Sequence, residues 1–212
     1  MNKQQQLDEL KKQMLADTTL PLKKGATNLV FGDGSSDADI LFIGEGPGYW
    51  EDVKAVPFVG NAGAFLNQLL ASVNIKREDV FITNVVHHRP PENRDPEPEE
   101  LSAYGKYLDK IIEIINPKVI VTLGRFSMAK FIPNVMISGI HGKEREVEIN
   151  GRRVLVFPMY HPAAALRNGS VRTQSMIDFK KLPVILDEVR KSEADERQES
   201  EADKKVEQMN LI

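Results

Sequence analysis

Apolar, β-branched runs that alternate with helical patterns restrict the fold of this chain more than any other feature. Residues 118–123 read Lys-Val-Ile-Val-Thr-Leu and residues 80–83 read Val-Phe-Ile-Thr, both typical of strands buried in a parallel sheet. Apolar residues at helical spacing occupy 62–73 and a long segment that starts near Pro98 and stops before Pro117. Strands that alternate with helices build a mostly parallel sheet with helices on both faces. We therefore predict a three-layer α/β/α sandwich with a central, mostly parallel sheet.

Turn residues and apolar spacing predict the remaining elements. Asn150-Gly151 lies between two short strand patterns, and both residues tolerate positive φ, so this pair predicts a β-hairpin. The other predicted elements are a helix over 3–16, strands over 28–31 and 39–43 with a turn at 32–36, a helix after Gly124 that contains Met128 and Phe131, and a last helix over 178–189.

Length and charge limit the class of protein. A chain of 212 residues, 41% hydrophobic, fits one domain. We place this domain at 1–187 and a charged, flexible tail at 188–212. The net charge of −3 argues against a protein that nucleic acid wraps around. Many of the acidic residues lie in the tail, however, so the domain can still carry a local basic face. No apolar run approaches the ~20 residues of a membrane span, and the start lacks a signal peptide's apolar core. We expect a cytoplasmic monomer.

Four short blocks of residues follow predicted strands or lie at loop tips. They are Gly44-Glu45-Gly46-Pro47-Gly48 with Glu51-Asp52, Pro57-Phe58-Val59-Gly60, Thr83-Asn84-Val85-Val86 running into Arg89-Pro90-Pro91-Glu92-Asn93-Arg94, and Tyr160-His161-Pro162 with Leu166-Arg167. A dinucleotide loop is disfavoured because Tyr49 stands where the last glycine of that motif belongs, and because Pro47 has no N–H to donate. In parallel sheets the ligand crevice lies at the carboxyl ends of the strands, so the blocks are expected to share one site.

In order and spacing, these blocks resemble the uracil-DNA glycosylase superfamily, and most closely its family 4, over about residues 17–185. The resemblance implies a DNA repair hydrolase of base excision repair. Such an enzyme flips uracil out of single- or double-stranded DNA, hydrolyses the N-glycosidic bond and leaves an abasic site. No lysine nucleophile for a further lyase step stands out in the sequence.

The resemblance also implies roles for the first two blocks. Phe58 supplies the aromatic platform for the flipped base, and stacking of a base on such a ring contributes about 1–3 kcal/mol. The loop of Glu45, Gly46 and Pro47 contacts uracil through backbone groups and positions the hydrolytic water. A carboxylate for that water can come from Glu45, which we prefer, or from Glu51.

The other two blocks supply hydrogen bonds and DNA contacts. Asn84 ends a strand, and its carboxamide matches the N3–H and O4 of uracil and mismatches cytosine, although an Asn there can also cap a turn. A His161 donor to uracil O2 would stabilise the departing anion. The resemblance implies that this loop enters the duplex with a bulky residue, but the corresponding position is Ala165 here, and Leu166 next to it can take that role. The candidate phosphate contacts are Arg89, Arg94, Arg167, Arg172 and Lys180.

The chain departs from family 4 in having no cysteine, whereas that family holds an iron–sulfur cluster on four. The corresponding positions are Asp17, Leu20, His88 and Tyr104. Zinc on His87, His88 and Asp17 is an alternative, but adjacent histidines usually diverge in direction. We expect no cofactor and no metal, and packing and hydrogen bonds of Tyr104 and His88 in place of the cluster.

Two other functions fit the same residues. One is a non-catalytic DNA- or base-binding relative, and the other is a glycosylase with a shifted base preference, such as hypoxanthine or xanthine. Release of free uracil from a uracil-containing oligonucleotide separates an enzyme from a binding protein.

The last residues suggest a partner. The chain ends Gln208-Met209-Asn210-Leu211-Ile212, which resembles the short motif by which bacterial repair and replication proteins dock on the sliding clamp. Gln208 would occupy a polar subsite, and Met209, Leu211 and Ile212 an apolar groove. The polar stretch before them would act as the tether.

The composition yields a direct prediction about metal content. We expect the purified protein to be colourless and indifferent to chelators, because it offers no thiolate for iron. Visible absorbance and elemental analysis measure this. An absorbance band in the visible, or stoichiometric iron or zinc, would contradict it.

Overall fold

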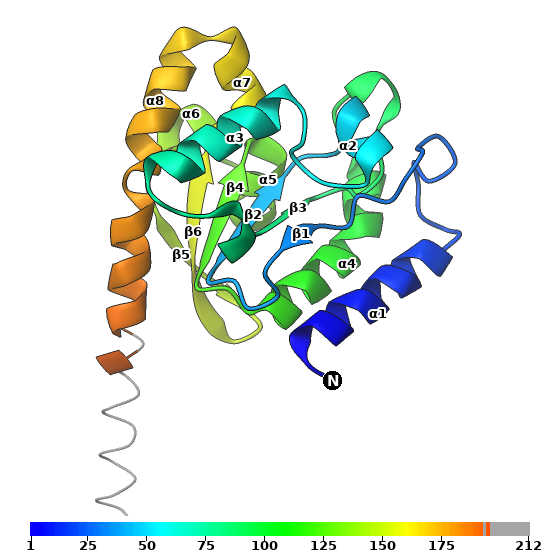
Figure 1. Ribbon diagram of the computed structural model, residues 1–212, viewed down its shortest axis with the longest axis horizontal. Coiled ribbons are helices and arrows are strands. Elements are labelled where there is room, and N and C mark those ends of the chain that lie inside the picture. The colour runs from blue at the N-terminus through cyan, green and yellow to red at the C-terminus, as the bar shows by residue number, and fades with distance from the viewer. Residues whose placement is uncertain (193, 196–212) are drawn as a thin grey trace, which may run out of the picture.

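A six-stranded sheet with strand order β1-β3-β2-β4-β6-β5 forms the centre of the protein (Figure 1). The structure is a computed structural model that describes residues 1–192 and 194–195. The four inner strands are parallel, and an antiparallel strand closes each edge. The strands are β1 (Asp33–Gly34), β2 (Ile40–Gly44), β3 (Phe81–Asn84), β4 (Val119–Leu123), β5 (Arg145–Ile149) and β6 (Arg152–Met159).

Helices cover both faces of the sheet, which confirms the predicted α/β/α fold class. Because side chains alternate along a strand, β2 sends Leu41 and Ile43 to one face and Ile40 and Phe42 to the other. The first face packs on α1 (Lys3–Ala16) and α4 (Pro98–Ile115), and the second on α3 (Asn61–Ser72) and α8 (Gly169–Phe179) (Figure 1).

Short helices follow the carboxyl ends of the inner strands. After β2 comes α2 (Tyr49–Lys54), after β4 come α5 (Arg125–Phe131) and α6 (Ile137–Ile140), and after β6 comes α7 (Pro162–Arg167). Two 3₁₀ turns, Arg77–Asp79 and Pro91–Asn93, flank β3. The loops of the four sequence blocks are therefore attached to short, rigid elements at one end of the sheet.

Two of the predicted elements are wrong. Residues 28–31 form no strand, because their backbone makes only isolated contacts, such as Val30 N–H to His87 O at 2.8 Å; β1 lies instead inside the predicted turn. The single helix predicted over 178–189 is interrupted. Helix α8 ends at Phe179, and a second helix spans 182–192, because Pro183 has no N–H with which to continue the helical ladder.

The hairpin prediction is confirmed. Asn150 and Gly151 join β5 to β6 with φ of 52° and 75°, so both turn residues are left-handed. That conformation matches the right-handed twist of the paired strands.

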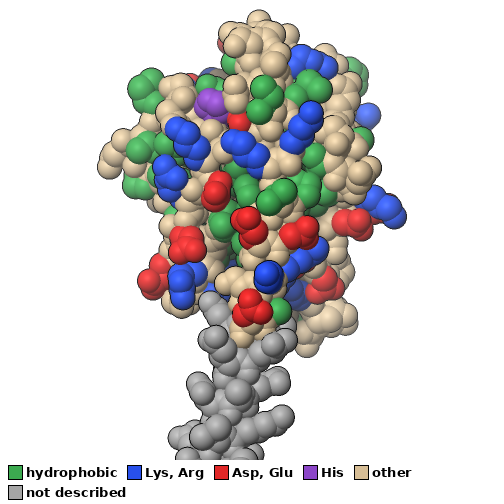
Figure 2. Space-filling view, turned by 90° about the vertical axis from the view of Figure 1, so that its left-hand side faces the viewer, with side chains coloured by type: hydrophobic (Ala, Val, Ile, Leu, Met, Phe, Trp, Pro, Cys, Tyr) green, Lys and Arg blue, Asp and Glu red, His purple; other side chains and the backbone are tan. Residues whose placement is uncertain are grey.

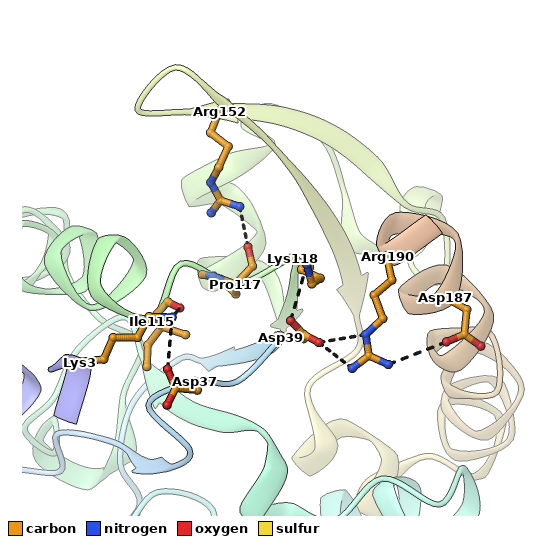
Figure 3. A network of polar contacts seen from close by, with 9 residues as sticks. All are labelled: Lys3, Asp37, Asp39, Ile115, Pro117, Lys118, Arg152, Asp187 and Arg190. Atoms are coloured by element: carbon orange, nitrogen blue, oxygen red, sulfur yellow. Dashed lines mark hydrogen bonds and ion pairs between the residues drawn. The ribbon is translucent and has the colours of Figure 1, made fainter. Parts of the chain in front are cut away.

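Polar contacts tie separate segments together at the amino-terminal edge of the sheet (Figure 3). Asp39 accepts two hydrogen bonds from Arg190, at 2.6 and 2.9 Å, and lies 3.9 Å from Lys118. Arg152 donates to Pro117 O at 2.9 Å, and Lys3 to Ile115 O at 2.8 Å. These contacts hold the hairpin, α1 and the helix over 182–192 against the sheet. The domain boundary at 187 stays a prediction.

Two further observations concern the described part of the chain. Within it, no helix combines the length and apolar character that crossing a membrane requires. The clamp-binding prediction at Gln208, Met209, Leu211 and Ile212 lies outside the described residues.

Tyr104 connects the segments that carry the cysteine-equivalent positions. It is fully buried; its hydroxyl donates to Pro21 O and lies 2.7 Å from His88 Nδ1. Because that hydroxyl has one proton, His88 must donate its Nδ1–H to it. Leu20 is buried beside this pair. The polar contacts therefore link α4, the chain after α1 and the segment after β3.

The same four positions do not fit an iron–sulfur cluster. Leu20 has no atom that could bind a metal, and Nδ1 of His88 is hydrogen-bonded to Tyr104. The Asp17 carboxylate accepts hydrogen bonds from Thr19 N at 2.9 Å and from Tyr107 Oη at 2.7 Å. Hydrogen bonds from Thr19 and Tyr107 hold the pKa of Asp17 well below its usual range. Among the residues that the structure describes, no group of three His, Asp or Glu side chains is arranged to hold a metal ion.

This arrangement predicts a stabilising role for the Tyr104 hydroxyl. Tyr104→Phe leaves the Pro21 carbonyl and His88 Nδ1 without their partner, and should lower the free energy of unfolding by about 1–3 kcal/mol. Urea unfolding measures this change. Tyr49→Phe, which alters an exposed tyrosine, is the matched control, and a loss no larger than in that control would refute the role.

Candidate active site

A pocket of about 620 Å³ opens at the carboxyl ends of the inner strands. Nine predicted site residues line it: Glu45, Gly46, Pro47, Glu51, Phe58, Asn84, Arg94, His161 and Arg167. The other four, Arg89, Leu166, Arg172 and Lys180, lie outside the lining. The crevice predicted from strand polarity therefore brings all four sequence blocks together.

The loop that carries Phe58 is held in a strained conformation. Phe58 has φ of 52°, a left-handed value that is uncommon for a bulky residue. Arg77 donates to the carbonyls of Pro57 and Phe58 at 2.6 and 3.3 Å. On the other side, Glu51 Oε1 accepts from the backbone N–H groups of Val59 and Gly60 at 3.0 and 2.9 Å. These contacts compensate the strain and hold the ring in the pocket wall.

Gly44 brings the Phe58 ring and the Asn84 side chain close together. A Cβ atom at Gly44 would lie 2.4 Å from Asn84 Oδ1 and 2.7 Å from two ring carbons of Phe58. Only a glycine allows both groups to pack on the backbone at the end of β2. The aromatic face and the carboxamide consequently share one corner of the pocket.

The carboxamide of Asn84 is free to bind a ligand. The residue is 2% exposed, yet no described residue forms a hydrogen bond with its side-chain oxygen or nitrogen. Its oxygen and nitrogen are not among the fully buried side-chain atoms without a partner, so they open into the pocket, where a ligand that offers a donor and an acceptor can bind them.

His161 is a neutral donor directed by its own helix cap. It caps α7, and its Nδ1 accepts from Ala163 N–H at 3.1 Å, so the proton of the neutral ring lies on Nε2. Burial lowers the pKa of His161 to about 4, although Glu51 opposes and Arg167 adds to this shift. The ring centroid lies 5.7 Å from that of Phe58, at 33°. At neutral pH this side chain can donate a hydrogen bond without carrying charge.

The two candidate carboxylates differ in their surroundings. One oxygen of Glu51 is committed to the Phe58 loop, as described above. Glu45 Oε1 lies 3.4 Å from Phe126 N, and burial raises the pKa of Glu45 above its ordinary value, while contacts with Phe126 and Arg125 oppose that rise. A raised pKa makes the ionised carboxylate a stronger base.

The basic residues at the site also differ in availability. Arg94 forms two hydrogen bonds with Glu100, at 2.6 and 2.9 Å, and Arg125 pairs with Asp95. Within the described part of the chain, Arg167 makes no side-chain hydrogen bond or ion pair, and Arg89 bonds only Asn93, at 2.8 Å. Arg167 and Arg89 are therefore the cations most available to a phosphate.

Side chains around α7 and α8 complete this surface. Leu166 is 45% exposed, whereas Ala165 is buried in the core. Arg172 of α8 contacts Gln68 at 3.0 Å and the Phe65 ring. Lys180 is exposed. On the face shown in Figure 2, Lys and Arg side chains are spread from the upper to the lower part, and most Asp and Glu side chains lie in the middle and lower parts.

Sequence reasoning missed several pocket residues. Gly124 and Arg125 line the pocket after β4, and Asp95 and Ile137 line it from neighbouring loops. The strand-end rule could have found Arg125, since it follows the clearest predicted strand. No local signal marks Asp95 or Ile137, because they reach the pocket only through the path of their loops.

The pocket thus combines a planar aromatic face, an amide edge and a neutral donor, an arrangement that fits a flat, hydrogen-bonding ring. Comparison with known proteins specifies the class further. The family model described as Uracil DNA glycosylase superfamily matches residues 31–180. The chain belongs to this superfamily.

Its curated relatives include several type-4 members. The chain is 47% identical over 182 residues to the type-4 uracil-DNA glycosylase of Archaeoglobus fulgidus, a match that covers 83% of this chain and 91% of that protein. It is 44% identical to the type-4 enzyme of Sulfurisphaera tokodaii (83% of each chain) and 46% identical to that of Saccharolobus solfataricus (78% and 79%). The predicted resemblance to family 4 is confirmed.

The buried histidines predict loss of stability in mild acid. Burial lowers the pKa values of His87 to about 3 and of His88 and His161 to about 4, against ~6.5 in an unfolded chain. Between about pH 6.5 and 4 the unfolded chain therefore binds protons that the folded protein does not. The free energy of unfolding should fall by about 1.4 kcal/mol per pH unit for each histidine that titrates. The raised pKa of Glu45 acts in the opposite direction above pH ~4.5.

Urea unfolding between pH 7.5 and 4.5 tests this dependence. His87→Gln removes one of the three groups and should flatten the slope by about one proton. Stability that does not change across this range would contradict the assignment.

Proposed function

We propose that this protein is a monofunctional uracil-DNA glycosylase that flips uracil out of DNA, hydrolyses its N-glycosidic bond and leaves an abasic site. The observation that carries the proposal is the unpartnered Asn84 carboxamide, packed beside Phe58 in a pocket of a chain 44–47% identical to named type-4 enzymes. Uracil has the donor and acceptor that such a carboxamide requires. The proposed enzyme acts as a cytoplasmic monomer without a metal or cofactor.

Phe58 and Asn84 would select the base. A uracil stacked on the Phe58 ring would direct its N3–H and O4 edge toward Asn84. Cytosine would present its N3 acceptor and its amino donor to the same carboxamide, where uracil presents the N3–H donor and the O4 acceptor, so both of cytosine's groups are mismatched. Stacking provides affinity for any base, so discrimination falls to the hydrogen bonds of Asn84.

His161 would stabilise the leaving group. As the bond to the sugar breaks, negative charge accumulates on the base, and a donor aimed at O2 lowers the energy of that state. Its low pKa keeps the ring neutral at pH 7, with the proton on Nε2 and Nδ1 held by Ala163 N–H. The donor is thus oriented before the reaction begins.

Glu45 would position and activate the water. Its raised pKa and its place in the lining favour it as a base, and its negative charge would also favour an oxocarbenium-like sugar. The role of Glu51 follows from its backbone contacts: it supports the Phe58 loop and leaves a second oxygen near the pocket.

DNA would approach through the rim of the pocket. Arg167 and Arg89 are the proposed phosphate contacts, and the exposed Leu166 is the proposed wedge that takes the place of the flipped base. Arg94 is paired with Glu100, so its proposed contact with DNA would require the guanidinium to bind Glu100 and a phosphate at the same time.

Uracil release from single-stranded and duplex oligonucleotides tests the proposed function. Free uracil and an alkali-labile site are the expected products. Binding of uracil-containing DNA without release would indicate a non-catalytic relative, and release of hypoxanthine or xanthine in preference to uracil would indicate a shifted base preference.

Substitutions at the two hydrogen-bonding residues give a second test. Asn84→Ala and His161→Ala should each lower the single-turnover rate by ~10²–10³, the usual effect of losing one such donor. His161→Ala also removes the cap of α7, so His161→Ser, which keeps a capping oxygen, is the matched variant. It should be as slow as His161→Ala but more stable. Near-wild-type rates for these variants would refute the site.

We also propose that the chain end docks on a sliding clamp. The Gln208-Met209-Asn210-Leu211-Ile212 sequence supports this, because it combines the Gln208 amide with three apolar side chains, Met209, Leu211 and Ile212, after a polar stretch. Titration of a labelled 203–212 peptide against the clamp should show binding that Gln208→Ala with Leu211→Ala abolishes. No binding at tens of micromolar would refute it.

A further inference from the structure

Two exposed aromatic side chains stand at the edge of the pocket. Tyr49 and Trp50 open α2 directly after Gly48, a residue of the pocket lining, and they are 53% and 55% exposed. Their ring centroids lie 5.1 Å apart at 77°, an edge-to-face pair. Large aromatic groups exposed side by side are uncommon on a soluble protein and mark a binding surface. We call Tyr49 and Trp50 the aromatic ledge.

The ledge is continuous with the pocket on both sides. Trp50 Cδ1 is within 3.8 Å of the position a Cβ would occupy at Gly60, whose N–H Glu51 binds. The guanidinium carbon of Arg89 lies 5.3 Å from the centre of the Tyr49 ring, and its Nε donates to Asn93, a pocket residue, at 2.8 Å. In Figure 1, α2 lies beyond the end of β2, on the pocket side of the sheet.

The chemistry of the ledge fits an unpaired nucleobase. Every base has a π-face that can stack on an aromatic ring, and such stacking contributes about 1–3 kcal/mol per base. The Arg89 guanidinium beside Tyr49 donates one hydrogen bond, from Nε to Asn93, and its terminal N–H groups can meet a phosphate. Val53 of α2 is also 45% exposed, but the Arg89 guanidinium beside Tyr49 favours a ligand that carries a phosphate over an apolar protein surface.

We propose that Tyr49 and Trp50 bind the base that flanks the target uracil in single-stranded DNA. This rests on the proposed function, because the ledge adjoins the pocket assigned to uracil. In duplex DNA the flanking base stays stacked on its neighbours and paired, so it cannot leave to meet the ledge. The ledge therefore favours single-stranded substrates over duplex ones.

Intrinsic fluorescence reports on this contact directly, because Trp50 is the single tryptophan of the chain. Titration of the full-length protein with a uracil-free single-stranded oligonucleotide should quench the emission saturably. The matching duplex should quench it much less at the same nucleotide concentration. An emission that single-stranded DNA leaves unchanged, or that both DNAs quench equally, would overturn the inference.

Kinetics of uracil release give the second measurement. Trp50→Ala and Tyr49→Ala should raise KM for a single-stranded uracil substrate roughly 5- to 150-fold, which is 1–3 kcal/mol of stacking, and KM for the duplex by much less. Trp50→Phe keeps an aromatic face and should restore most of the affinity. Val184→Ala, at an apolar residue 59% exposed in the helix over 182–192, is the matched control and should change neither KM.

The two proposals fail in different ways. Wild-type protein that releases uracil while the ledge variants lose affinity equally for both substrates, or for neither, would overturn the ledge and leave the function. Wild-type protein that releases no uracil would overturn the function. The fluorescence titration would still test the ledge in that case, because it uses DNA without uracil.

Discussion

Pairing of β2 with a parallel neighbour on each side is the constraint on which the rest of the structure depends. Its register with β3 places Gly44 directly beside Asn84, and its register with β4 aligns Ile43 with Thr122. Parallel strands end at the same edge of the sheet, so strand direction alone brings the loops after β2, β3, β4 and β6 together at that edge. The absence of a side chain at Gly44 then lets Phe58 and Asn84 meet on one backbone position.

Side chains of the candidate site depend on neighbouring residues that have no proposed role in the reaction. Phe58 keeps its left-handed backbone because Arg77 binds the carbonyls of Pro57 and Phe58, and Glu51 binds the two backbone N–H groups that follow. The proton of the neutral His161 ring lies on Nε2 because Ala163 N–H occupies the other ring nitrogen. Burial, which lowers the pKa of His161 and raises that of Glu45, favours the neutral form of both groups. The site is organised by the hydrogen bonds around it as much as by its own side chains.

The region corresponding to the cluster of family 4 is built from ordinary packing. Tyr104 is hydrogen-bonded to Pro21 and His88. The Asp17 carboxylate accepts hydrogen bonds from Thr19, Lys106 and Tyr107. These contacts link the same segments that the four cysteine positions span. The His88–Tyr104 hydrogen bond is buried in the core cluster to which α1 and α4 contribute, whereas the contacts of Asp17 with Thr19 and Lys106 lie nearer the surface.

The amino-acid sequence by itself determined the layer architecture, the hairpin at Asn150 and Gly151, and the four blocks that line the pocket. These follow from local chemistry: apolar periodicity, turn residues that accept positive φ, and strand polarity. Tertiary structure alone decided which of the two carboxylates is bound to a loop, which arginines are engaged, and that residues 28–31 lie beside the sheet without joining it. It also decided that Asp95 and Ile137 lie at the pocket, and that the rings of Tyr49 and Trp50 are exposed at its edge. Such facts depend on how distant loops pack, and local sequence carries no period or spacing that records a long-range contact.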